Sequence, residues 1–597
     1  MFDNCEKFSG RIRFQKRKEA MKNYYSFISC VLIGIILIQY RISYSGLSSE
    51  KPLKITTWDA LGYYMYLPGT FIYHDITKMS WIPAIDSTYQ VTGGKFYQAS
   101  KLDNGNYTGK YLGGIAILQS PFFLIGHLIA LNSEYPPDGF SPPYQYAIGF
   151  GIVFYFILGV FLLRSILLKF FNDITSSISL LLLILASNAI QYASIDNGQS
   201  HAPIFFLYTL IIYFTIKWHQ KPILFYACLI GYIIGLSIIS RPTEAIMFLI
   251  PLLWNTQTKE IAAKKWAMVK QHKNQIGFVM LFGFLGILPQ LIYWKITTGS
   301  FIYDVGSKWY FLNPFFRVLV GWEKGWFIYT PVTLLFVAGM FFMNPFPFKK
   351  SVLYFCLLNI YIIISWSDWR YGGSYSTRAL VQSYPMFALP LAALIDRIQL
   401  QKFRYIFYLL SLYLIGVNLF QIKQYNSTVL HYYDMNRQYY QRIYLNNKPT
   451  PLDMSLLDTK DWIANENEYK KTVLFSSDSI IPIQIVHGNS QMIARYSPEQ
   501  DAAKKTNEES WLKIESTLQL NSWSNSSLIC DLQQGDSIQH SQVRLLNALT
   551  KPMQENQYAF YVKVPGFFAQ SNILLTIRSE ENMNALLKQV KITSFKK

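Results

Sequence analysis

The sequence predicts an all-α polytopic membrane domain followed by a small, mostly β domain at the C-terminus. Of its 597 residues, 51% are hydrophobic and only 15% are charged, whereas soluble domains carry about a quarter charged residues. Apolar runs of about 20 residues, the length that a helix needs to cross a bilayer, fill most of the chain before residue 420. The basic residues between these runs follow an alternating pattern, and the polar tail shows strand-like alternation.

The first element is a basic arm, residues 1–23, which is followed by an apolar stretch at 24–41. Lys and Arg side chains stay on the cytoplasmic side of a membrane, so the arm is predicted to lie inside. A cleaved signal peptide also begins with a basic arm, but no clear small-x-small cleavage site follows Tyr40. The stretch is therefore predicted to remain as an anchor.

About eleven apolar stretches are interpreted as spans of a membrane domain at residues 24–422. With the arm inside, the even-numbered connections are cytoplasmic, and these are the basic ones, residues 255–274 above all. The predicted spans are 24–41, 144–166, 176–194, 201–216, 222–239, 242–254, 275–294, 326–344, 351–366, 379–395 and 404–421. The predicted outer parts are 42–143, the loops near 195 and 241, 295–325, 367–378 and the residues after about 423.

Residues 112–131 are apolar enough to span but are interrupted by Gly113, Gly114 and Pro121. A span here would turn every later connection around and send the basic ones outward, against the positive-inside rule. We therefore predict a helix that lies along the outer interface of the membrane.

The tail, residues 423–597, is polar and long enough to form its own domain. An amphipathic helix is predicted at 432–445, and short alternating strands separated by turn residues predict a β-sandwich from about residue 470. The predicted strands are 472–475, 480–486, 511–520, 558–564, 573–577 and 590–595. Trp511 and Trp523 are candidates for stacking on a glycan, although packing in the core is the favoured interpretation.

Charge and cysteine patterns exclude several classes of function. The net charge is +19 and the pI is about 9.3, but the positive charge is spread over short connections rather than one domain, which argues against nucleic-acid binding. No P-loop, dinucleotide fingerprint or nucleophile elbow is present. The widely spaced cysteines indicate neither a disulfide framework nor a zinc site; they are Cys5, Cys30, Cys228, Cys356 and Cys530.

Polar residues of the predicted outer loops are the candidates for chemistry, and Asp59 comes first. It lies in residues 56–64, which read TTWDALGYY. Apolar and aromatic neighbours can raise the pKa of a carboxylate, which makes Asp59 a candidate general base. Alternatively, Asp59 caps a short helix, since Asp is a favoured N-cap residue. The next acids along the loop are Asp75 and Asp86.

Two further clusters combine charge with turn residues. Lys110 and Tyr111 precede the predicted interfacial helix, where a cation at a helix N-terminus forms an anion site, unless the lysine only snorkels. Asp196 and His201 flank a predicted span boundary in the sequence SIDNGQSH and could bind a metal or a sugar. Turn chemistry alone also explains Asp196.

The loop at 366–378 reads WSDWRYGGSYSTR and contains Arg370, Tyr371 and Arg378. Guanidinium groups suit phosphate oxygens, and two of them with Gly-Gly between can converge on one anion. The alternative is a pair of interfacial cations balanced by Asp368. Arg241 adds another outer cation beside a span. The mixture of aromatic and basic residues in 295–325 suits a sugar-phosphate surface or an aromatic belt equally.

Taken together, these residues resemble those of GT-C type integral membrane glycosyltransferases, which include protein mannosyltransferases and lipid A aminoarabinose transferases. The resemblance covers about residues 24–420 and rests on Asp59, Lys110, Asp196 and the stretch WRYGGSYSTR. It implies that Asp59 orients or deprotonates the acceptor hydroxyl and that Lys110 meets the lipid phosphate. Arg370 and Arg378 are weaker candidates for that phosphate. Many relatives have an adjacent acidic pair where this chain has Asp59 alone, so the resemblance gives no certain cofactor and leaves a divalent metal open.

The predicted function is therefore transfer of a hexose or pentose, with inversion, from a polyprenyl-phosphate donor to a glycan, lipid or protein acceptor. The reaction is placed on the outer side of the cytoplasmic (inner) membrane, within the cell envelope, with the N-terminus inside and the tail outside, where it would recognise the acceptor. The alternatives are a lipid-linked sugar transporter or flippase, and an oligosaccharide ligase or polymerase of similar architecture. The predicted substrate-binding residues are Lys110, Tyr111, Asp196, His201, Arg241, Arg370, Tyr371 and Arg378.

Overall fold

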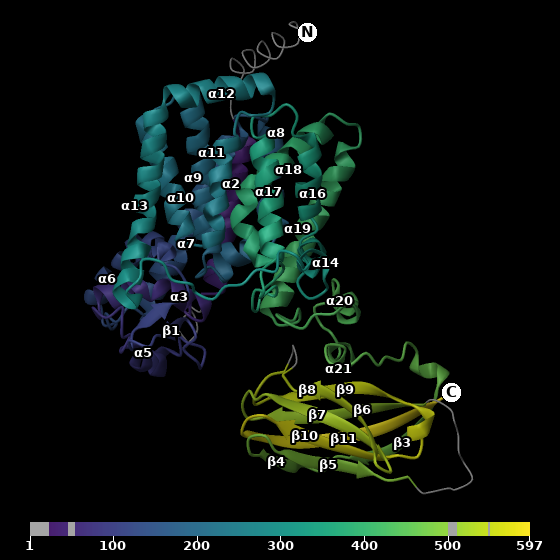
Figure 1. Ribbon diagram of the computed structural model, residues 1–597. Helices are drawn as coiled ribbons and strands as arrows, with labels where there is room; N and C mark the ends of the chain where they lie inside the picture. The colour runs from purple at the N-terminus through teal and green to yellow at the C-terminus, as the bar shows by residue number, and fades with distance from the viewer. Residues whose placement is uncertain (1–22, 46–53, 499–509, 547–549) are drawn as a thin grey trace. The chain divides into compact units, whose positions relative to one another are not determined.

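The computed structural model describes residues 23–45, 54–498, 510–546 and 550–597. The chain forms two compact units, Met1–Leu419 and Phe420–Lys597, shown in Figure 1. The first unit is helical and the second is mostly β, as the sequence predicts.

The helical unit confirms most of the predicted apolar elements. Within the described part of the chain, seven helices are long and apolar enough to cross a membrane, and the protein is a multi-pass membrane protein. The main helices are α2 (Tyr24–Ser43), α6 (Gly114–Leu131), α7 (Pro142–Leu167), α8 (Asp173–Leu185), α9 (His201–Gln220), α10 (Leu224–Ile238), α13 (Lys273–Thr298), α17 (Lys349–Ile364), α18 (Tyr384–Gln399) and α19 (Arg404–Asn426).

Three predicted spans are interrupted. The stretch 326–344 is not one helix, because Pro331 lacks an amide proton and separates α15 (Trp326–Tyr329) from α16 (Thr333–Gly339). The stretch 242–254 begins as the 3₁₀ helix η2 (Pro242–Phe248) before α11 (Leu249–Leu253). Within the predicted span 176–194, helix α8 ends early, at Leu185. The chain then continues to the π-helical turn η1 (Gln191–Ile195).

Elements of the predicted outer loop and of the most basic connection lie at opposite ends of the helical unit. Helices α3 (Asp59–Tyr64) and α5 (Ile82–Tyr89) are at one end, and α12 (Lys259–Gln271) is at the other (Figure 1). Short pieces between α3 and α6 are α4 (Tyr66–Phe71) and the hairpin of β1 (Ala99–Lys101) and β2 (Tyr107–Gly109). This separation is the arrangement that the positive-inside pattern predicts.

Helix α6 confirms the helix predicted at 112–131, although it begins at Gly114, and it continues through Pro121. It packs closely on α7, where a Cβ added to Gly126 would lie 2.9 Å from the Cα of Tyr144. Its length and hydropathy also suit a membrane span, so its place along the interface stays a prediction.

Helices α10 and α13 also approach each other closely through glycines. A Cβ added to Gly235 would lie 2.2 Å from the carbonyl oxygen of Gly283, and one added to Gly231 would lie 2.1 Å from that of Val279. Small residues let membrane helices pack backbone against backbone. This contact fixes α13, whose C-terminal end carries residues of the site described below.

Arg41, at the end of α2, holds the turn that follows α8. Its side chain is buried and donates to the carbonyl oxygens of Ser194 and Ile195 at 2.7 and 3.0 Å, and to Asn197 Oδ1 at 3.1 Å. These bonds satisfy backbone carbonyls where the helical pattern is broken. They position the turn that leads to Gln199 and His201.

The second unit contains two antiparallel sheets, with strand orders β5-β10-β7-β8 and β3-β11-β6-β9, and β4 pairs with β11. Residues of both sheets share one core, among them the fully buried Ile514, Leu518, Leu528 and Leu575. The strands are β3 (Lys470–Ser477), β4 (Ile481–Ile485), β5 (Ser490–Tyr496), β6 (Ser510–Leu520), β7 (Ser526–Gln534), β8 (Ser537–Arg544), β9 (Glu555–Val564), β10 (Asn572–Ser579) and β11 (Met583–Lys596).

Some details of the tail differ from the prediction. Strands β5, β7 and β8 are not predicted from the sequence, and β8, which reads SIQHSQVR, is largely polar. The amphipathic helix begins only at Arg437, where Asn436 caps α20 (Arg437–Ile443). The core interpretation is wrong for Trp523, whose surface is 57% exposed.

Candidate active site

Asp59 occupies the first position of α3, at the predicted outer end of the helical unit. The N-cap residue of α3 is Trp58, whose φ of 55° is in the left-handed region. Its amide donates to Val91 O at 3.0 Å, and Gln98 Nε2 donates to Trp58 O at 3.0 Å. The capping interpretation of Asp59 is therefore wrong, and its carboxylate is available to side chains from other segments.

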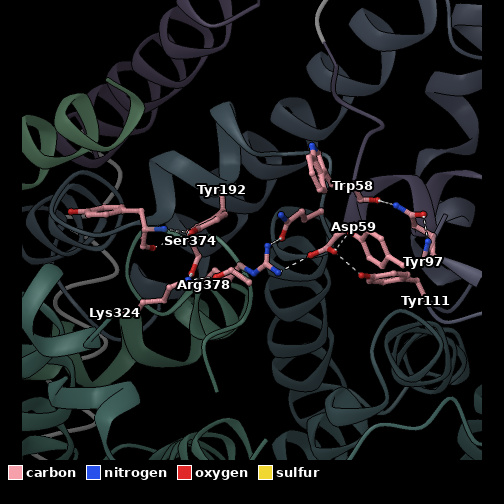
Figure 2. A network of polar contacts seen from close by, with 12 residues as sticks. Trp58, Asp59, Tyr97, Tyr111, Tyr192, Lys324, Ser374 and Arg378 are labelled. Carbon is pink, nitrogen blue, oxygen red and sulfur yellow. Dashed lines mark hydrogen bonds and ion pairs between the residues drawn. The ribbon is translucent and has the colours of Figure 1, made fainter. Parts of the chain in front are cut away.

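Three donors hold the Asp59 carboxylate (Figure 2). Arg378 Nη2 donates to Oδ2 at 2.7 Å, while the hydroxyls of Tyr97 and Tyr111 donate to Oδ1 at 2.8 and 2.7 Å. The side chains of Arg378 and Asp59 are only 11% and 26% exposed. Ion pairs shielded from solvent in this way are screened much less than surface pairs.

The electrostatics of Asp59 differ from the sequence-based expectation. Burial acts to raise the pKa of Asp59, but the Arg378 charge and the hydrogen bonds from Tyr111, Tyr97 and Arg378 outweigh it and lower the pKa. The expected rise is therefore wrong, because the aromatic neighbours contribute phenol donors as well as apolar surface. Burial and the nearby Asp59 charge raise the pKa of Tyr97 and of Tyr111, so both remain proton donors.

Tyr111 fits against α3 because residue 62 is glycine. A Cβ added to Gly62 would lie 2.0 Å from Tyr111 Cδ2, so any side chain there would push the ring away. The Tyr111 ring also meets Tyr63 edge-on, with 4.8 Å between ring centroids. The sequence TTWDALGYY thus provides the Asp59 carboxylate and, at Gly62, the space in which the Tyr111 ring packs.

Arg378 is held from its other side by Gln199, whose Oε1 accepts from Nη1 at 2.7 Å. Arg378 begins the 3₁₀ helix η4 (Arg378–Ser383), and Gln382 of the same helix contacts His201 Nδ1 through Oε1 at 2.7 Å. Gln382 Nε2 also donates to Glu244 Oε1 at 3.1 Å. His201 is therefore part of a buried polar network that fixes η4 against the start of α9.

Lys324 and Tyr192 hold the loop before Arg378 (Figure 2). The Lys324 ammonium donates to Gly372 O and, at 3.0 Å, to Ser374 Oγ. The Tyr192 hydroxyl donates to Tyr375 O at 3.0 Å and accepts from Tyr375 N at 2.8 Å. Gly372, with a φ of 63°, supplies the left-handed turn of this loop.

A pocket of about 410 Å³ adjoins the Asp59 network, because Tyr111 contributes to both. Lys110, Arg241 and Tyr371 also line it, so four of the eight predicted substrate-binding residues meet here. Many of its walls are aromatic, and they include Tyr63, Trp294, Tyr303, Trp309 and Trp366. Apolar walls with a few convergent polar groups are typical of small-molecule sites.

Three predicted residues lie in other surroundings. Asp196 Oδ2 accepts from Gln191 Nε2 at 2.8 Å within its own turn, and His201 is in the network with Gln382. The Arg370 guanidinium lies 5.1 Å from the Trp369 ring centroid. Conversely, Tyr97 and Tyr192 build the site but lie outside every predicted cluster. Gln199 and Lys324 lie inside the predicted clusters SIDNGQSH and 295–325 but were not predicted as substrate-binding residues.

The Asp59 carboxylate meets hydrogen-bond donors rather than further carboxylates. Its partners are one guanidinium and two phenols, whereas Mg²⁺ and Ca²⁺ are held mainly by several carboxylate or carbonyl oxygens. Asp75 accepts from the amides of Lys78 and Ser80 at 2.7 and 2.9 Å, and Asp86 binds Thr92. In the described ranges, no group of three His, Cys, Asp or Glu residues is placed to hold a metal ion.

No family model matches the chain, and no curated protein matches it. Several solved structures are similar to it. ArnT from Cupriavidus metallidurans in the apo state has 10% identity and a TM-score of 0.36, covering 57% of this chain and 60% of that one. The archaeal oligosaccharyltransferase AglB from Archaeoglobus fulgidus, in complex with an inhibitory peptide and a dolichol-phosphate, has 11% identity and a TM-score of 0.42. That match covers 70% of this chain and 57% of AglB.

The arabinosyltransferase EmbB from Mycobacterium smegmatis has 8% identity and a TM-score of 0.37, covering 96% of this chain and 64% of that one. The chain thus spans about three fifths of the length of the solved structures it matches.

Proposed function

We propose that the protein is a membrane glycosyltransferase that moves a sugar from a polyprenyl-phosphate donor to an acceptor hydroxyl on the outer side of the cytoplasmic membrane. One observation carries the proposal: Tyr111 joins the ionised Asp59 carboxylate to the wall of a pocket that contains Lys110 and Arg241. Tyr111 therefore links Asp59, which we propose orients the acceptor, to the pocket that we propose binds the donor phosphate.

The pocket suits the donor. Lys110 and Arg241 provide two positive charges, and Arg in particular binds phosphate oxygens through a planar fork. The aromatic walls offer flat surfaces to a sugar ring. Stabilising the charge that develops on the departing phosphate is the kind of contribution that usually dominates catalysis.

Asp59 suits the acceptor. The acceptor hydroxyl gives its proton to Asp59, and its oxygen bonds to the anomeric carbon from the face opposite the phosphate. The bond from that carbon to the phosphate oxygen breaks, and its electron pair leaves with the polyprenyl phosphate. Three donors weaken Asp59 as a base at rest, so displacement of one phenol by the acceptor hydroxyl raises its basicity when it is needed.

The place of these groups supports an enzyme over a transporter. A transporter gathers its polar binding groups near the middle of the membrane. Here Asp59 and Lys110 belong to the connection between α2 and α6, at one end of the helical unit. The proposed orientation places this end and the tail outside, and the N-terminus inside, with a glycan, lipid or protein as the acceptor.

The test is transfer by the purified protein, with radiolabelled polyprenyl-phosphate sugars and a crude membrane glycan extract as acceptor. We expect label to move from lipid to acceptor. If the donor is not consumed and labelled lipid instead changes leaflet in proteoliposomes, the protein is a transporter and the proposal is wrong.

Lys110 gives a second prediction. We expect Lys110→Gln to lower kcat/KM for the donor roughly 10- to 100-fold, since a charge-assisted hydrogen bond contributes about 1.5–3 kcal/mol and the phosphate gains charge in the transition state. The matched control is Lys101→Gln, because Lys101 is also an exposed lysine of this outer loop but does not line the pocket. Equal kcat/KM values for both variants would show that Lys110 only snorkels.

A further inference from the structure

We infer that residues 310–320, which we call the anchor segment, insert their side chains into the outer leaflet of the membrane and hold the adjacent wall of the pocket at headgroup level. The sequence leaves open whether the loop at 295–325 is a sugar-phosphate surface or an aromatic belt. In the structure the loop divides, because residues between 303 and 309 line the pocket and residues 310–320 do not. The anchor segment is therefore a second surface, beyond the proposed function.

The anchor segment exposes large apolar side chains outside the main helices. Leu312 is fully exposed, and Phe316 and Val320 are 64% and 56% exposed. Val320 ends the short helix α14 (Arg317–Val320), which lies at the same end of the helical unit as α3 (Figure 1). Exposed apolar surface that is concentrated in this way marks contact with a membrane or with another protein.

The exposed face of α17 identifies lipid as the occupant. Tyr354, Leu357 and Tyr361 recur on one face of this helix and are 55%, 55% and 40% exposed, as expected for a span that faces lipid. At the end of this face the Tyr361 hydroxyl donates to Phe311 O at 2.7 Å. The apolar face of α17 thus continues directly into the anchor segment.

Helix α17 is also too short to cross the hydrocarbon by itself. Its 16 residues rise about 24 Å at about 1.5 Å per residue, whereas the hydrocarbon core is about 30 Å thick. Lys349 and Lys350 begin the helix and belong with the headgroups at the predicted cytoplasmic end. The missing thickness of about 6 Å therefore falls at the other end, where the anchor segment supplies apolar side chains.

The backbone of the anchor segment suits a place at the acyl boundary. Unpaired backbone groups are too costly in hydrocarbon, and here the segment is paired to the end of α17. Tyr310 N donates to Ser365 O at 2.6 Å, and Phe315 N donates to Ile364 O at 2.7 Å. With its backbone held in this way, the segment lies at the interface and only its side chains enter the acyl region.

Cations beside the apolar side chains fit the phosphates of lipid headgroups. The guanidinium carbon of the exposed Arg317 lies 4.5 Å from the Trp369 ring centroid, and that of Arg370 lies 5.1 Å from the same ring. Tryptophan is enriched at membrane interfaces, and arginine side chains reach from apolar surface to the headgroups. Apolar side chains with adjacent cations have the composition of a lipid-binding surface.

The test measures the depth of a fluorescent probe on Leu312→Cys in the full-length protein in nanodiscs of phosphatidylcholine and phosphatidylglycerol. Leu357→Cys on α17 is the lipid-facing reference, and Ser87→Cys, at an exposed residue of α5, is the water-facing reference. The labelled parent protein gives the background from the native cysteines. We expect nitroxide-labelled lipids to quench the probe at position 312 about as strongly as at 357, and iodide to quench it about threefold less than at 87.

Two outcomes would overturn the inference. Iodide quenching at position 312 as strong as at position 87 would show that the anchor segment lies in water. Protection from both quenchers would show that protein, and not lipid, covers it. Neither readout uses glycosyl transfer, so the anchor and the proposed function stand or fail separately.

A Phe316→Gln variant tests whether apolar side chains hold the segment in place. We expect iodide quenching of the probe at position 312 to rise about twofold, while thermal unfolding stays unchanged because Phe316 is exposed. The matched control is Phe341→Gln, at an 82% exposed residue of η3 (Met340–Phe342) near the predicted cytoplasmic end, which should leave the probe unchanged. Equal quenching in the two variants would overturn the assignment of Phe316.

Discussion

The Asp59→Asn variant is expected to lose sugar transfer by about 10³-fold while it keeps its affinity for the donor. General acid–base catalysis contributes about 10²–10⁴-fold, and the amide of Asn cannot take the proton from the acceptor hydroxyl. Donor affinity should be preserved because Lys110 and Arg241, the proposed phosphate contacts, line the pocket and Asp59 does not. The measurement is kcat for transfer together with equilibrium binding of the labelled donor.

A control must exclude misfolding, because the substitution leaves the Arg378 charge without its partner. Breaking a buried pair costs about 3–5 kcal/mol, and this pair, being partly exposed, costs less. Thermal unfolding should therefore show a lowered but cooperative transition. Asp103→Asn, at an exposed acid of the same loop, should retain full activity. Transfer by Asp59→Asn at the wild-type rate would sink the assignment of Asp59.

The helical architecture could be predicted because it depends on local composition. Hydropathy over about 20 residues and the placement of Lys and Arg are properties of neighbouring residues, and they identified the first residues of α2 and α9. Interruptions such as the one at Pro331 were missed because the stretch around them is still apolar. Strand β8 was missed because its residues are mostly exposed and polar, so no hydrophobic alternation marks it.

The site could be predicted only as a set of separate clusters. Asp59 and Arg378 were both candidates, yet nothing in the sequence pairs residues that are 319 positions apart. Tyr97 gave no signal, because one tyrosine among 43 carries no spacing information. The direction of the Asp59 pKa shift was wrong for the same reason, since it depends on which donors the fold brings to the carboxylate. Local sequence thus provides the chemical groups, and the long-range packing of η4 against α3 decides their charge state.

The Arg378→Gln variant tests this dependence through the pH profile of transfer. In the wild type the pKa of Asp59 is lowered, so the carboxylate is ionised down to below about pH 4, and we expect kcat/KM to be flat from pH 7 to 5. Without the guanidinium, burial is opposed only by the two phenols, and the pKa rises. The acid limb of the profile should then move to higher pH, and transfer at pH 7 should fall about 100-fold as transition-state positioning is lost.

The thermal stability of the protein at pH 7 should also fall when Arg378 is replaced by Gln. A carboxylate whose folded-state pKa is lowered stabilises the fold above its unfolded pKa of about 3.9, and that contribution disappears as the pH falls through the folded-state value. Thermal unfolding of Arg378→Gln should therefore lie below the wild type at pH 7, and the difference should shrink toward pH 3. Arg378→Lys keeps the charge and should keep the wild-type position of the acid limb, although it loses the second hydrogen bond to Gln199. An acid limb that does not move in Arg378→Gln would show that Arg378 does not control Asp59, because the lowered pKa would then have another origin.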